Sequence, residues 1–98
     1  MVSKRKPYWW TFGTPTTLVL YRTPERWRYA VHFTGPEGVA DGALDHPTTS
    51  GEPESAQAAM HRRAEEFTRR ELEISWAEAD RPDHWTGLIT SAGPLPAL

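Results

Sequence analysis

The chain has 98 residues, which is enough for one domain with one modest core, and it contains no cysteine. Disulfide bonds and cysteine-ligated zinc are therefore excluded, and no apolar stretch is long enough for a membrane span or a secretory signal, so we expect a cytosolic protein without a membrane partner. The formal net charge of −2 conceals an asymmetry, because residues 1–34 carry a charge of +5 and residues 35–98 carry −7. Either a basic face meets an anionic partner, or the two halves neutralise each other within one fold.

The first twelve residues divide at Pro7 into a tail and a strand. Residues 1–7 are predicted to be a flexible basic tail, and residues 8–12 (YWWTF) read as a short aromatic strand. Adjacent strand residues face opposite ways. If Trp10 joins the core, Trp9 points outward and is free to contact a partner.

Two further strands are predicted over residues 17–22 and 26–34, on either side of a turn at Pro24. The second strand alternates with period 2, which places its large aromatic and aliphatic residues on one face and its smaller or charged residues on the other. The predicted core face holds Trp27, Tyr29, Val31 and Phe33, and the opposite face holds Arg28, Ala30 and His32. Residues 39–45 could add a weak fourth strand.

A helix is predicted to follow the loop at residues 46–55, with Pro53 in its first turn and Thr49 or Ser50 as its cap. Spacings of 4, 4 and 3 place four residues on one apolar face, namely Ala56, Met60, Ala64 and Phe67. The opposite face is charged, and its pairs Glu65–Arg69 and Glu66–Arg70 have the favourable i,i+4 order.

The period then changes to 2 over residues 72–78, where Leu72, Ile74 and Trp76 alternate with smaller or charged residues. This alternation favours a strand over a continued helix. Residues 84–90 are predicted to return as its partner, and residues 91–98 read as a flexible tail rich in proline and glycine. Trp85 either anchors this hairpin on the core or forms an exposed contact for a protein partner.

The element order is therefore β-β-β(-β)-α-β-β. It predicts an α+β fold, in which an antiparallel sheet has one helix packed across it. We expect a single domain over residues 8–90, flanked by the tails at 1–7 and 91–98.

The sequence carries no motif for catalysis. It has no nucleophile elbow, no P-loop and no glycine-rich dinucleotide turn. Asp41, Asp45 and His46 are close in sequence, but their spacing does not match a zinc or calcium site. We therefore expect no enzymatic activity, no cofactor and no metal.

The leading hypothesis is a non-catalytic binding or regulatory module that acts through protein–protein contacts, with Trp9 and Trp85 as candidate contact residues. The partner would be another protein or a second copy joined along a sheet edge. The alternative is a nucleic-acid-binding protein, because single strands are held by cations and exposed aromatic rings. Its candidate residues are Lys4, Arg5, Lys6, Arg22, Arg26, Arg28 and His32, with Tyr21 on a mixed outer face.

Nine arginines against two lysines, with many alanines, glycines and prolines, make the chain similar in style to small uncharacterised proteins of actinobacteria and their phages. The layout from RYAVHF to EPESAQAAMHRRAEEF resembles that of HicB-type antitoxin domains. A three-stranded sheet followed by one helix is also similar to the arm-binding domain of phage-type integrases. These resemblances concern element order and carry over no residue.

Overall fold

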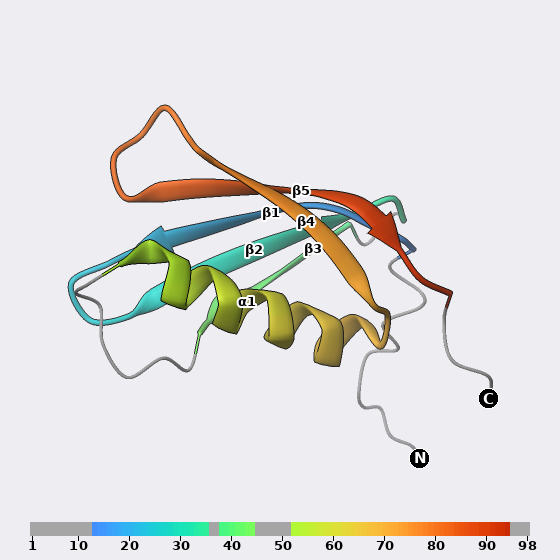
Figure 1. Ribbon diagram of the computed structural model, residues 1–98. Helices are drawn as coiled ribbons and strands as arrows, with labels where there is room; N and C mark the ends of the chain where they lie inside the picture. The colour runs from blue at the N-terminus through green and yellow to red at the C-terminus, as the bar shows by residue number, and fades with distance from the viewer. Residues whose placement is uncertain (1–12, 36–37, 45–51, 95–98) are drawn as a thin grey trace, which may run out of the picture.

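The computed structural model describes residues 13–35, 38–44 and 52–94. Within them, one antiparallel five-stranded sheet is covered on one face by a single helix, which confirms the predicted α+β fold (Figure 1). The predicted strand at residues 8–12 lies outside the described residues. So do Trp9, Trp10, the basic residues of the tail, and the two predicted capping residues Thr49 and Ser50.

The elements follow the predicted order, and the weak strand after residue 38 is present. They are β1 (Pro15–Arg22), β2 (Trp27–Phe33), β3 (Val39–Ala43), α1 (Pro53–Thr68), β4 (Leu72–Glu78) and β5 (His84–Ala92). The strand order in the sheet is β3-β2-β1-β5-β4. The first described strand is therefore the centre of the sheet, and it pairs on one side with the last described strand.

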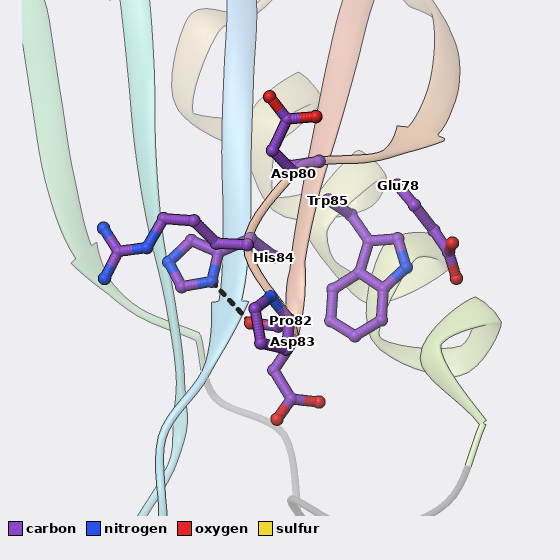
Figure 2. A pocket seen from close by; sticks show the side chains of 8 residues that line it. Glu78, Asp80, Pro82, Asp83, His84 and Trp85 are labelled. Atoms are coloured by element: carbon purple, nitrogen blue, oxygen red, sulfur yellow. Dashed lines mark hydrogen bonds between the residues drawn. The ribbon is translucent and has the colours of Figure 1, made fainter.

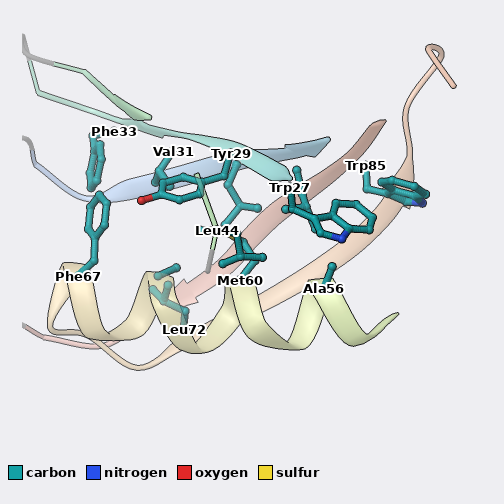
Figure 3. Packing of buried hydrophobic residues seen from close by; sticks show 13 residues of the cluster. Trp27, Tyr29, Val31, Phe33, Leu44, Ala56, Met60, Phe67, Leu72 and Trp85 are labelled. Atoms are coloured by element: carbon teal, nitrogen blue, oxygen red, sulfur yellow. The ribbon is translucent and has the colours of Figure 1, made fainter. Parts of the chain in front are cut away.

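The core lies between α1 and the sheet (Figure 3). The large alternating residues of β2 and the apolar stripe of α1 both face this core, as the sequence predicts. The buried hydrophobic residues are Leu18, Leu20, Trp27, Tyr29, Val31, Phe33, Leu44, Ala56, Met60, Ala64, Phe67, Leu72 and Trp85. At one end of this layer Phe67 of α1 stacks on Phe33 of β2, with ring centroids 6.1 Å apart.

The start of α1 differs from the prediction. Pro53 occupies the first turn, where its missing N–H costs nothing, but Glu52 is the N-cap residue and its side chain makes no capping hydrogen bond. The first turn carries Glu54, whose negative charge suits the positive end of the helix dipole.

The end of α1 overturns the predicted ion pairs Glu65–Arg69 and Glu66–Arg70. Arg69 has φ 60° and ends the helix, and its N–H donates to the Glu65 carbonyl at 2.9 Å. The two arginines are therefore not on the helical surface with their expected partners. Arg70 instead donates to the Gly93 carbonyl at 2.7 Å.

The β4–β5 hairpin confirms that residues 72–78 form a strand. The left-handed residue Arg69 stops the helix before this segment and redirects the chain into the sheet. β5 continues to Ala92, two residues past the predicted end of this strand at residue 90. Gly93 then donates its N–H to the Glu71 carbonyl at 2.8 Å, which fastens the two ends of the hairpin.

Among the described residues, no helix combines the length and the apolar character that a membrane span requires.

Candidate functional site

The face of the sheet opposite α1 carries the groups that bear on binding, and no described helix or strand covers it. We call it the outer face. Strand register arranges its side chains in three rows across the strands. The first row is Ala43, Arg28, Tyr21 and His84; the second is Asp41, Ala30, Val19, Thr86 and Ala77; the third is Val39, His32, Thr17, Leu88 and Ser75.

The first row combines two rings with a cation. Tyr21 of β1 and His84 of β5 are cross-strand partners, and their rings stack with centroids 5.1 Å apart and planes 7° from parallel. His84 is held in place because its Nδ1 donates to the Pro82 carbonyl at 2.9 Å. Arg28 of β2 lies opposite Tyr21 on its other side. The row therefore presents a fixed pair of rings beside one guanidinium group.

The third row holds two exposed apolar residues, with His32 and Thr17 between them. Val39 is 49% exposed and Leu88 is 54% exposed, and they are the exposed large hydrophobic residues of the described chain. Both belong to the same row on the same face. Between the first and third rows, the second row has short side chains such as Ala30 and Thr86. Both apolar side chains are therefore available to a molecule that covers this face, although the polar residues between them keep them apart.

The outer face has almost no net charge within its three rows, and Glu73 adds a carboxylate on the same side beyond them. Its three rows contain one arginine, Arg28, and one aspartate, Asp41, together with the two histidines His32 and His84. With the histidines neutral, the two opposite charges cancel. A face that tracks a phosphate backbone would instead be strongly cationic.

The structure separates the cations that the sequence grouped for nucleic-acid binding. Arg22 belongs to the inner side, where its guanidinium lies 4.7 Å from the centre of the Trp27 ring and its Nε lies 3.3 Å from Asp83 Oδ1. Arg26 lies in the exposed β1–β2 turn, where its N–H donates to Thr23 Oγ1 at 3.1 Å. Of the described candidates, Arg28 and His32 alone reach the outer face, while Lys4, Arg5 and Lys6 lie outside the described residues.

Trp85 is in the core. It is 8% exposed, and its ring centroid lies 5.5 Å from that of Trp27. The guanidinium of Arg22 covers part of its ring, 5.7 Å from the centroid. This position favours the anchoring role over the exposed contact that the sequence left open, because little of the indole surface is free. The other predicted contact residue, Trp9, lies outside the described residues.

A hollow of about 290 Å³ lies at the β4–β5 turn and is lined by residues 78–85 (Figure 2). The carboxylates of Glu78, Asp80 and Asp83 point in different directions, so they do not converge on one point. Within the described residues, no group of three histidine, cysteine or acidic side chains is placed to hold a metal ion. Asp83 has φ 60°, and its carbonyl accepts the Arg22 N–H at 3.0 Å, which joins the turn to the end of β1.

No family model, curated protein or solved structure matches the chain. A proposal about function therefore depends on the residues of the outer face. Sequence reasoning placed Tyr21, Arg28 and His32 on such a face but did not include His84, Leu88 or Val39. The alternation of His84, Thr86 and Leu88 along β5 could have identified two of these, because Trp85 and Gly87 between them face the core.

Proposed function

We propose that this protein is a non-catalytic binding module that holds a protein partner against the outer face of its sheet. The observation that carries the proposal is the position of Leu88 and Val39. Both are about half exposed, both lie in one row, and the stacked pair Tyr21–His84 lies on the same face. Aromatic and apolar groups of this kind are what the centre of a protein interface buries.

The outer face is large enough for a small specific interface. Five strands at about 4.8 Å spacing, each about seven residues long at about 3.3 Å per residue, cover roughly 550 Å². A partner that covers this face therefore buries roughly 1,100 Å² in total, which is at the lower end of specific interfaces. Such an area suits a reversible regulatory contact.

The charge of the outer face favours a protein partner over nucleic acid. Arg28 is offset by Asp41, and Arg22 is committed to Asp83 and to the tryptophans of the core. Nucleic-acid binding stays the alternative because the Tyr21–His84 pair and Arg28 supply rings and one cation, and single strands bind to such groups.

The test uses Leu88→Asp, which places a charge at an exposed apolar residue of the outer face, and Ala58→Asp as a matched control. Ala58 is exposed on α1, on the other side of the molecule, and its substitution adds the same charge. A protein captured by the full chain is purified, and its affinity is measured by calorimetry. We expect Leu88→Asp to weaken binding about tenfold or more, which corresponds to about 1.4 kcal/mol, and Ala58→Asp to leave it within about twofold. Equal affinities for the two variants would refute the proposed surface.

Two further measurements separate the alternatives. Light scattering shows whether the chain is a dimer, and a dimer that Leu88→Asp dissociates identifies a second copy as the partner. Titration with single- and double-stranded oligonucleotides at about 50 mM salt tests nucleic acid. Oligonucleotide binding that Arg28→Ala weakens would favour the nucleic-acid alternative over the protein partner.

A further inference from the structure

Side chains of α1 block one edge of the sheet at the first residue of β4. β4 is an edge strand, and at Leu72 both outward backbone groups have partners from α1. The Leu72 N–H donates to Glu65 Oε2 at 2.9 Å, and the Leu72 carbonyl accepts from His61 Nε2 at 2.8 Å. No further strand can pair with β4 at this residue without displacing these two side chains.

The rest of this edge is open. Ala79 donates its N–H to the His84 carbonyl at 3.0 Å, so alternation along β4 directs the backbone groups of Ala77 and Ser75 toward β5 as well. The backbone groups of Ile74, Trp76 and Glu78 therefore point away from the sheet, and no described strand lies on that side. We call residues 74–78 the open edge. Such an edge can accept an additional strand.

Carboxylates flank the open edge at both ends, and Arg81 lines the hollow at the turn end together with two of them. Residues 71–80 contain Glu71, Glu73, Glu78 and Asp80 and no cation. None of the four forms an ion pair within the described part of the chain. Glu71 and Glu73 line a hollow of about 350 Å³ at one end, and Glu78 and Asp80 line the hollow of the β4–β5 turn at the other.

We propose that the open edge binds an extended segment of a partner protein that carries two cations five residues apart. An antiparallel strand that places one cation opposite Glu78 has its sixth residue opposite Glu73. Glu73 and Glu78 lie on opposite faces of β4, and two strand residues five apart also face opposite ways, so both cations meet a carboxylate. The third and fifth residues of that segment lie beside Trp76 and Ile74, which are partly buried against the core. They are therefore apolar.

A second copy of this chain does not fit the open edge. Pairing of β4 with β4 would gather eight carboxylates against the four arginines at positions 70 and 81 of the two copies, which leaves an unfavourable excess of negative charge. The chain also has no two lysines or arginines five residues apart, so none of its segments has the required pattern. The occupant is therefore a different protein. This inference concerns the backbone edge of β4, which shares Ser75 and Ala77 with the outer face, and it does not depend on the function proposed for that face.

The probe is the hexapeptide Lys-Thr-Val-Thr-Val-Lys with blocked ends, titrated into the full chain. Its matched controls are the same peptide with glutamate in place of both lysines and the same peptide with N-methylated valines, which cannot donate backbone hydrogen bonds. We expect saturable binding of the first peptide and loss of binding for both controls. The affinity falls as salt is raised from about 50 to about 300 mM, because screening weakens exposed charge pairs.

Two protein variants and hydrogen exchange locate the contact. Glu73→Lys with Glu78→Lys should weaken binding about tenfold or more, whereas Glu54→Lys with Glu66→Lys, on the exposed surface of α1, should leave it unchanged. Circular dichroism verifies that both variants fold. Bound peptide should slow amide exchange at Ile74, Trp76 and Glu78.

Absence of saturable binding below about 1 mM peptide would overturn the inference. So would binding that leaves the exchange of Ile74 and Trp76 amides unchanged, because it would show charge attraction without strand pairing. Leu88→Asp would add a carboxylate beside Ser75 of the open edge, so the neutral Leu88→Thr is the variant used here, and it should not alter peptide binding. Failure at the open edge and failure at the outer face are therefore distinguishable.

Discussion

Gly87 lies where β5 passes between β1 and β4, and alanine should not fit there. A Cβ at this position would lie 2.8 Å from Ile74 Cγ2 and 3.1 Å from Leu18 Cδ1. Leu18 is completely buried, so it has little room to move. Overpacking of this kind costs about 1–3 kcal/mol. Alanine also lowers the conformational entropy of the unfolded chain relative to glycine, which recovers about 0.4–1 kcal/mol of stability. The net loss of stability is therefore about 1–2 kcal/mol.

The loss is measured by urea unfolding and by thermal unfolding, both followed by the fluorescence of the buried tryptophans. At about 4–8 °C per kcal/mol for a domain of this size, Gly87→Ala should lower Tm by roughly 5–15 °C. In an Ile74→Ala background the same substitution should cost less, because the closest methyl group is gone. Ser75→Ala, on the exposed side of β4, is the control and should change stability by less than about 0.5 kcal/mol. A Gly87→Ala protein as stable as wild type would refute the reasoning.

Three further predictions concern the helix end, the closed part of the edge and the outer face. Arg69→Gly should raise the free energy of unfolding by about 0.5–1 kcal/mol, because glycine adopts φ 60° without strain; a lower urea midpoint would contradict this. Glu65→Ala should cost about 1 kcal/mol and speed amide exchange at Leu72, whereas Glu66→Ala, whose side chain is 72% exposed, should do neither. Leu88→Thr should change stability by less than about 0.5 kcal/mol in thermal unfolding, since a larger loss would mean that the outer face is covered.

Local patterns in the sequence were sufficient to predict the helix and most of the strands. The alternation of Trp27, Tyr29, Val31 and Phe33 identified β2 and its buried face, because period 2 reflects the geometry of a strand directly. The stripe from Ala56 to Phe67 identified the buried face of α1 in the same way. These patterns depend on near neighbours in the chain.

The features that the sequence did not predict depend on conformation at single residues or on distant pairing. Arg69 gives no sign that it will take a left-handed conformation, since glycine is the usual residue there, so the expected pairs Glu65–Arg69 and Glu66–Arg70 were wrong. The outer face brings Tyr21 beside His84, 63 positions later in the sequence, and only strand order reveals such a neighbour. Whether Trp85 was buried also depended on this register.

The central place of β1 has a consequence for how the chain folds as it is synthesised. β1 can pair with β2 as soon as both have left the ribosome, but its other side must wait for β5, the last element described. Until then, the backbone groups of β1 that face β5 have no strand to pair with. The buried side chains of Leu18 and Leu20 also lack their β5 neighbours. We therefore expect closure of a long loop between the two ends of the domain to be the slow step, and a nascent chain stalled before residue 84 should be prone to pair with other chains.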